Sequence, residues 1–231
     1  MALKGKMVGF PFDGGTANGY LVEPEGDGPF PAVIVIQEWW GLNDHIKDIA
    51  GRFAKEGYAA LAPDLYDGVV TKDAEQAGKL MQALDQDKAL KSLDGAVDYL
   101  VGQANIRADR IGVTGFCMGG TFALLMACRN PKIKASVPFY GDVPQEEALK
   151  NLLAPVLFFA GDQDQWINAD KWKRLEAGLA DFEKEGEVKV YRGAGHAFFN
   201  DTRPDAYNKE AAEDAWARTL HFFEVYLKPK N

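Results

Sequence analysis

Cys117 is the side chain whose surroundings most clearly predict chemistry. It lies at the centre of Gly115-Phe116-Cys117-Met118-Gly119-Gly120. Residues 110–114 form a short apolar run typical of a buried strand, and residues 121–129 have the length and apolar character of a helix. A nucleophile between small residues, with a strand before it and a helix after it, is the pattern of a nucleophile elbow.

Such a turn would place the Cys117 thiol at the N-terminus of the helix. There the helix dipole and the free backbone N–H groups favour the thiolate and can receive an oxyanion that develops during a reaction. The flanking glycines would let strand and helix approach where side chains collide. The alternative is that Cys117 is a small buried hydrophobic residue in a glycine-rich turn, a common situation for a free cysteine.

Two other predicted strand ends carry groups that could activate a thiol. Gly161-Asp162-Gln163-Asp164 follows the strand 156–160, and Gly195-His196 lies in the loop after the strand 188–191. A thiol needs a base, and the base needs a carboxylate that orients it. The order of cysteine, aspartate and histidine is that of the α/β-hydrolase fold. Asp162 and Asp164 compete for the acid; the Gly-x-x-Asp spacing favours Asp164, with Asp162 as a turn former.

His196 is the histidine that we expect to act as the base, because it lies in a glycine-bounded loop at a strand end. His45 falls in a polar helix start, where a surface position is expected. His221 stands beside two phenylalanines in the last helix, where core packing is expected.

The elements that must position these residues alternate along the chain, which predicts an α/β fold with a mostly parallel sheet covered by helices on both faces. Such sheets bind ligands at the carboxyl ends of their strands. We expect a single domain over residues 1–231, opened by a hairpin. The expected strands are 8–12, 20–23, 31–36, 58–62, 110–114, 135–139, 156–160 and 188–191, and the expected helices are 44–55, 73–84, 88–101, 121–129, 145–153, 169–182 and 205–226.

Composition narrows the function classes. The 231 residues carry a net charge of −8 without a basic run, which argues against nucleic acid or an anionic membrane as a partner. No signal peptide or membrane-spanning run is evident, so a cytoplasmic protein is expected. Cys117 and Cys128 would lie about 16 Å apart on one helix, too far for a disulfide. This favours a reducing compartment, and Cys128 is assigned to the core.

No cofactor or metal is expected. The sequence has no His-x-His, Cys-x-x-Cys or His-Glu-x-x-His spacing. The glycines around Cys117 also do not match a phosphate-binding loop, because no Lys-Ser or Lys-Thr follows them.

Several motifs together resemble the dienelactone hydrolase family of α/β hydrolases. The most distinctive is Gln37-Glu38-Trp39-Trp40-Gly41 after the first buried strand, combined with cysteine in place of serine at the elbow. The other motifs, spread over nearly the whole chain, are Gly57-Tyr58-Ala59-Ala60, Pro63-Asp64-Leu65-Tyr66, Phe139-Tyr140-Gly141 and His196-Ala197-Phe198.

This resemblance implies a catalytic triad of Cys117, Asp164 and His196. It also implies that Glu38 holds the resting thiol and lets it ionise when substrate binds. The backbone N–H groups of Met118 and Trp39 would form the oxyanion hole.

Glu38 also has a physical reason to behave unusually. A carboxyl group beside two indole rings should resist ionisation, so its pKa could be raised far enough to exchange a proton with a thiol. The alternatives are that Glu38 caps the next helix or pairs with a lysine or arginine.

The reaction implied is attack of the Cys117 thiolate on a lactone or ester carbonyl, followed by hydrolysis of the thioester by water that His196 activates. An enol lactone suits this chemistry because its leaving group departs more easily than a thiolate. A small-molecule lactone or ester is therefore the expected substrate, and a monomer is expected. The alternatives are a general esterase or thioesterase, or a non-catalytic protein in which Cys117 senses oxidants.

One departure from the family pattern concerns the substrate. Members acting on dienelactone are expected to hold its carboxylate with two arginines, one before residues 77–80 and one four residues after the catalytic histidine. Here residues 73–76 contain no arginine, and Asn200 occupies the second position. Arg203, Lys72 or Lys79 could substitute, but a neutral ester is equally open.

Overall fold

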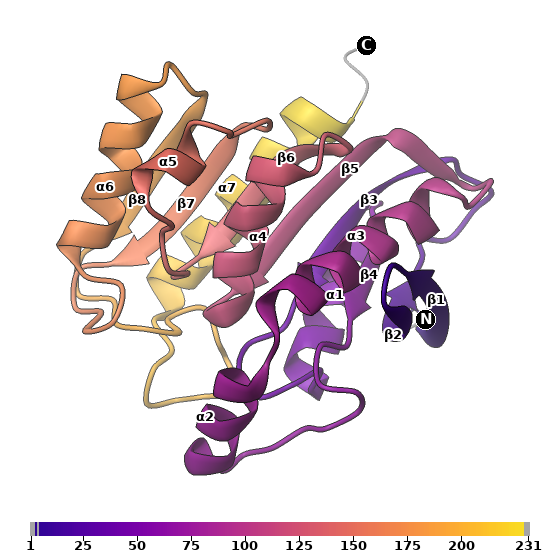
Figure 1. Ribbon diagram of the computed structural model, residues 1–231, viewed down its shortest axis with the longest axis horizontal. Coiled ribbons are helices and arrows are strands. Elements are labelled where there is room, and N and C mark those ends of the chain that lie inside the picture. Colours follow the sequence, from indigo (N-terminus) through magenta and orange to yellow (C-terminus); the bar gives the residue numbers. More distant parts are fainter. Residues whose placement is uncertain (1–2, 4, 229–231) are drawn as a thin grey trace.

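The computed structural model describes residues 3 and 5–228, and within them the chain forms an eight-stranded sheet with helices on both faces (Figure 1). The strand order is β1-β2-β4-β3-β5-β6-β7-β8. The strands are β1 (Lys6–Phe12), β2 (Gly15–Val22), β3 (Phe30–Ile36), β4 (Ala59–Pro63), β5 (Ile106–Phe116), β6 (Ile133–Phe139), β7 (Val156–Gly161) and β8 (Gly186–Tyr191).

The sheet is mostly parallel, as predicted. β1 and β2 form the opening antiparallel hairpin, and β2 also runs antiparallel to β4. From β4 to β8 every neighbouring pair is parallel. The carboxyl ends of β3, β5, β6, β7 and β8 therefore meet at one edge of the sheet.

The helices are α1 (Asp44–Lys55), α2 (Ala74–Ala83), α3 (Gln86–Val101), α4 (Met118–Arg129), α5 (Glu146–Leu149), α6 (Ala169–Asp181) and α7 (Lys209–Leu227). Figure 1 shows α3 and α4 in front of the sheet and α7 behind it. On the rear face α1 packs against α7 through Phe53, whose ring meets those of Trp216 and Phe223. With helices on both sides, β3 is apolar and buried along nearly its whole length.

Three helices differ from the predicted ranges by three or more residues at one end. α7 begins at Lys209 rather than at residue 205, because residues 201–206 form turns and Asn208 caps the helix by accepting a hydrogen bond from the Ala211 N–H. α4 begins at Met118, three residues early, because the elbow itself becomes its first turn. α5 is limited to Glu146–Leu149.

None of the helices in the described part of the chain has the length and apolar character needed to cross a membrane.

The predicted elbow is present between β5 and α4. Cys117 has φ 56° and ψ −119°, a conformation that non-glycine residues rarely adopt. The turn lies directly against β3, because a Cβ atom added at Gly119 would overlap the backbone oxygen of Ile36 and lie 2.5 Å from that of Gln37. Only a glycine permits this approach, which sets Cys117 at the carboxyl edge of the sheet.

Replacing Gly119 by alanine should therefore disrupt the elbow. The added methyl group meets backbone atoms that cannot rotate away, so we expect Gly119→Ala to lower the free energy of unfolding by at least about 3 kcal/mol, measured by urea denaturation. Gly51→Ala is the matched control, since a Cβ atom at this position in α1 has nothing within 4 Å. The control should gain up to about 1 kcal/mol from helix propensity. Wild-type stability of Gly119→Ala would contradict the close approach.

Candidate active site

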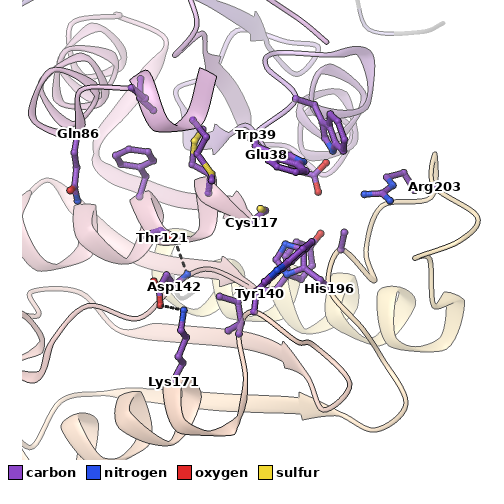
Figure 2. Close-up of a pocket in the computed structure, with 18 residues that line it drawn as sticks. Glu38, Trp39, Gln86, Cys117, Thr121, Tyr140, Asp142, Lys171, His196 and Arg203 are labelled. Atoms are coloured by element: carbon purple, nitrogen blue, oxygen red, sulfur yellow. Dashed lines mark hydrogen bonds and ion pairs between the residues drawn. The ribbon is translucent and has the colours of Figure 1, made fainter. Parts of the chain in front are cut away.

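The ends of β3, β5 and β8 bring Glu38, Cys117 and His196 to one pocket of about 550 Å³ (Figure 2). Trp39 and Met118, the residues expected to form the oxyanion hole, line the same pocket. Most of the remaining wall is aromatic or aliphatic: Trp40, Met81, Leu84, Phe122, Tyr140, Trp166 and Ile167. The pocket therefore offers a thiol, an imidazole and a carboxyl group within an apolar wall.

Asp164 is the aspartate that contacts the imidazole. Its Oδ2 atom lies 2.7 Å from Nδ1 of His196, and its Oδ1 atom accepts hydrogen bonds from the backbone N–H groups of Trp166 at 2.8 Å and Ile167 at 2.9 Å. Burial of the Asp164 carboxyl alone would raise its pKa, but the hydrogen bond and charge of His196 outweigh burial, with help from the two N–H groups, and lower the pKa. Because the carboxylate is ionised, it can only accept a hydrogen bond, so Nδ1 of His196 is the nitrogen that carries the proton and donates.

Asp162 has a different place. It is exposed, and its Oδ1 atom accepts a hydrogen bond of 2.7 Å from the backbone N–H of Gly193. This bond joins the loop after β7, which carries Asp164, to the loop after β8, which carries His196. Asp162 thus contributes to the site by holding the two loops together.

His196 directs its other nitrogen away from Asp164. Among the described residues, this buried Nε2 atom has no hydrogen-bond partner. Burial lowers the pKa of His196, but the hydrogen bond to Asp164 and the interaction with the Cys117 thiol together raise it to about 10. The rings of Tyr140 and Trp166 flank the imidazole, with centroids at 5.1 Å and 4.8 Å. These contacts orient a basic imidazole with Nε2 left available.

The two cysteines differ in their surroundings. Figure 2 shows the sulfur of Cys117 pointing into the space between Glu38 and His196. Cys128, eleven residues further along the chain at the other end of α4, packs against the core, and burial raises the pKa of its thiol to about 11. The chemistry of the pocket therefore falls to Cys117.

Glu38 is almost fully buried, with 1% of its surface exposed. Burial raises the pKa of its carboxyl to about 7, although a hydrogen bond from Asn200 and the charges of His196 and Arg203 act in the opposite direction. The prediction of a raised pKa is confirmed. The two alternatives for Glu38 are wrong: Asn43 caps α1, and among the described residues Glu38 forms no ion pair within 4.0 Å.

Trp39 and Met118 present backbone rather than side-chain donors. Met118 is the first residue of α4, so no carbonyl lies one helical turn before its N–H group. Trp39 belongs to the segment after β3, which Gln37 fixes by accepting a hydrogen bond of 3.1 Å from the Leu65 N–H. Both residues line the same pocket as Cys117.

The other two histidines are placed opposite to expectation. His45 is buried on the inner side of α1, with Nδ1 3.4 Å from Oδ1 of Asp201, and burial lowers its pKa to about 4. His221 is exposed on α7. The assignments failed because a helix start can turn inward and because Phe223, not His221, occupies the inner stripe of α7.

Three residues were suggested as replacements for the arginines that bind a substrate carboxylate. Of these, Arg203 lines the pocket, whereas Lys72 and Lys79 do not. The Arg203 guanidinium lies over the Trp40 ring at 5.6 Å and pairs with Asp205 at 2.8 Å. Lys79 instead pairs with Glu75 at 2.6 Å on an exposed face of α2, and Lys72 is also exposed.

Sequence reasoning missed two buried polar residues of this region. From the sequence, Asn200 was noted only because it stands where the family pattern has an arginine. In the structure its Nδ2 atom donates a hydrogen bond of 2.8 Å to Oε2 of Glu38. Its place after the apolar run 197–199 was the available signal of burial. Tyr140 was seen only as part of a motif, but its buried hydroxyl has no hydrogen-bond partner among the described residues, and its φ of 39° is left-handed.

The described residues contain no cluster of three or more histidine, cysteine, aspartate or glutamate side chains that could hold a metal ion.

Two relatives match nearly the whole chain in sequence. A protein of Bradyrhizobium sp. named "Probable 2-oxo-3-(5-oxofuran-2-ylidene)propanoate lactonase" is 40% identical over 226 residues, which cover 92% of this chain and 90% of that protein. A protein of Escherichia coli (strain K12) named "Putative carboxymethylenebutenolidase" is 34% identical, and the match covers 100% of this chain and 90% of that protein.

A solved structure gives the same relation in three dimensions. The crystal structure of a "Putative Dienelactone Hydrolase" from Klebsiella pneumoniae superposes with a TM-score of 0.91 at 33% identity, covering 98% of this chain and 100% of that chain. This identifies the eight-stranded architecture as the α/β-hydrolase fold.

The model of the dienelactone hydrolase family matches residues 17–227. The chain belongs to the dienelactone hydrolase family of lactone and ester hydrolases.

Proposed function

We propose that the protein hydrolyses an enol lactone or related ester through a thioester on Cys117. The observation that carries this proposal is the pairing of His196 Nδ1 with the buried Asp164 at 2.7 Å, which leaves Nε2 as the basic atom beside the thiol pocket. A pairing of this kind fixes the tautomer of the imidazole and stabilises its protonated form.

Attack begins at the sulfur. The Cys117 thiolate forms a bond to the carbonyl carbon, and the carbonyl oxygen becomes an oxyanion that the N–H groups of Met118 and Trp39 stabilise. Collapse of this intermediate breaks the ester C–O bond. In a lactone the leaving enolate stays attached to the acyl group and takes the proton from Nε2 of His196, which opens the ring and leaves a thioester and a neutral imidazole.

Water completes the reaction. His196 removes a proton from water through Nε2, and the hydroxide attacks the thioester carbonyl. Asp164 stabilises the imidazolium during this step. Breakage of the C–S bond then releases the carboxylic acid and the Cys117 thiolate, which takes back the proton held by Glu38.

Glu38 is the proposed acceptor of the resting thiol proton. A carboxyl group with a pKa of about 7 holds and releases a proton near neutral pH, as this exchange requires. Its place in the same pocket as Cys117 supports the role.

The apolar wall and Arg203 support a flat, unsaturated lactone with a carboxylate. One relative is named for a lactone of this type, an oxofuranylidene propanoate. The indole rings of Trp39 and Trp40 can contact a flat ring, and Arg203 lies over Trp40 at the edge of the pocket. We therefore propose an anionic enol lactone as substrate, with Arg203 binding its carboxylate.

Removal of the sulfur tests the nucleophile. Cys117→Ala should lower kcat/KM for lactones and activated esters by at least about 10⁴-fold, because it removes the atom that forms the acyl intermediate. Cys128→Ala is the matched control and should keep wild-type activity. Mass spectra of acid-quenched wild-type enzyme during turnover should show the acyl group on the peptide containing Cys117. Undiminished turnover by Cys117→Ala would refute the mechanism, and a wild type that hydrolyses no ester but forms a sulfenic acid readily would favour a redox role.

The raised pKa of Glu38 makes stability depend on pH. Between the ordinary value of 4.5 and about 7, the folded protein holds a proton that the unfolded chain has released, so this group makes stability fall as the pH rises through that window. Glu38→Gln should remove this fall. The difference in free energy of unfolding between Glu38→Gln and the wild type should therefore change by on the order of 3 kcal/mol in favour of the variant from about pH 4 to pH 8. Urea denaturation at each pH measures this difference. Glu176→Gln, at an exposed position on α6, should show no such change.

A matched pair of substrates tests Arg203. For an oxofuranylidene carboxylate, Arg203→Gln should raise KM about 10-fold through loss of a charge-assisted hydrogen bond and leave kcat nearly unchanged. The methyl ester of the same lactone should keep its wild-type KM, and Lys79→Gln should affect neither substrate. Equal effects of Arg203→Gln on both substrates would show that Arg203 does not bind the carboxylate.

A further inference from the structure

Asn200 is a buried residue that contacts Glu38 without lining the pocket. Only 1% of its surface is exposed, and it is not among the residues that line the pocket. Its Nδ2 atom donates a hydrogen bond of 2.8 Å to Oε2 of Glu38. Its Oδ1 atom accepts two hydrogen bonds from Thr202, one from the backbone N–H at 3.0 Å and one from the hydroxyl at 2.6 Å.

Thr202 determines which way the amide of Asn200 points. A backbone N–H can only donate, so the amide atom that faces it must be the oxygen. The NH₂ group is therefore directed at Glu38. The bond from the Thr202 N–H thus distinguishes Oδ1 from Nδ2 of Asn200, two atoms that are similar in size and shape.

This orientation determines where Glu38 can carry its proton. Oε2 already accepts an N–H bond, and a proton on that oxygen would face another hydrogen. A carboxylic acid accepts hydrogen bonds more strongly at its carbonyl oxygen than at its hydroxyl oxygen, so the bond to Oε2 favours the proton on Oε1 when Glu38 is neutral. The carboxyl group would then offer the pocket one oxygen that alternately carries and releases a proton.

We propose that Asn200, oriented by Thr202, is a positioning residue that sets the proton affinity of Glu38 and directs its proton to Oε1. This inference rests on the proposed role of Glu38. A neutral amide donor lowers the pKa of a buried carboxyl without supplying the full charge of an ionic partner. The pKa of Glu38 is thereby held at about 7. Burial alone would raise this pKa further, and a paired cation would lower it.

The other groups around Glu38 come from three segments. His196 and Arg203, in the loop after β8, lower the pKa of Glu38 through their charges. Tyr140, at the end of β6, has its own pKa raised well above the ordinary value, first by burial and then by the charge of Glu38. Cys117 faces the same space from the elbow. Among these groups Asn200 is the one with a hydrogen bond to the carboxyl.

Two substitutions at residue 200 test the proposal. Asn200→Ala removes the donor and should move the titration of Glu38 upward by about one pH unit. Asn200→Asp keeps the shape and the acceptor for Thr202 but replaces the donor with a second carboxyl group, so its shift should be larger. The direct readout is the infrared carbonyl band of the protonated Glu38, assigned with Glu38→Gln, and the second readout is the low-pH limb of kcat/KM.

Thr202 provides a graded pair of variants. Thr202→Val removes the hydroxyl donor but keeps the backbone N–H, so it should give a smaller upward shift than Asn200→Ala. Thr202→Ser restores a hydroxyl and should return the titration toward the wild-type midpoint. Asn151→Ala removes an exposed amide next to α5 and serves as the control, with no shift expected.

The outcomes separate this inference from the proposed function. If Asn200→Ala and Asn200→Asp lower Tm while the infrared midpoint of Glu38 stays at its wild-type value, Asn200 only stabilises the loop and the inference is overturned. If Asn200→Ala does not fold, Asn200→Asp and Thr202→Val supply the same comparison. Full turnover by Cys117→Ala would refute the proposed function, whereas the infrared titration would still report on Asn200.

Discussion

The close backbone approach of the elbow to β3 is the constraint on which the rest of the site depends. Gly119 packs against the backbone of Ile36 and Gln37, where no side chain fits. The approach holds Cys117 at φ 56° and at the same time places the end of β3 next to it. Glu38 and Trp39 follow directly on that strand, so one contact brings together the thiol, the carboxyl group and one proposed oxyanion donor.

Two walls of different construction face each other across the thiol. On one side, Asp164 and His196 are bonded to each other, and their loops are joined by the bond from Gly193 to Asp162. On the other side, Glu38 receives support from a distant part of the chain through Asn200. The first wall favours a charged imidazole, whereas burial on the second favours a neutral carboxyl group. Both groups therefore favour their protonated forms, one as a cation and the other as a neutral acid, within one pocket.

The sequence predicted the elements that repeat a simple physical pattern. Apolar runs identified every strand of the central sheet, and glycine spacing located the elbow. Loops at strand ends pointed to residues 164 and 196, because parallel strands deliver their carboxyl ends to one edge. Burial beside the indoles was sufficient to predict the direction of the Glu38 pKa.

The features that the sequence did not reveal depend on contacts between distant segments. Asn200 and Glu38 are separated by 162 positions, and the sequence around an asparagine does not indicate which distant residue its side chain will bind. The burial of His45 depends on how the loop containing Asp201 crosses α1. The start of α7 was misplaced because the polar residues 205–208 are compatible with either a helix or a turn. In the structure Asn208 caps the helix, so these residues lie outside it.

The weak anchoring of α2 has a consequence for evolution and engineering. Within α2, all of whose residues the structure describes, Ala77 alone is buried, although Met81 of this helix and the adjoining Leu84 line the pocket. A helix held by so little buried surface can exchange its pocket-facing side chains at small cost to folding. New substrate preferences should therefore arise more readily by drift in residues 74–84 than by change in the bonded loops after β7 and β8.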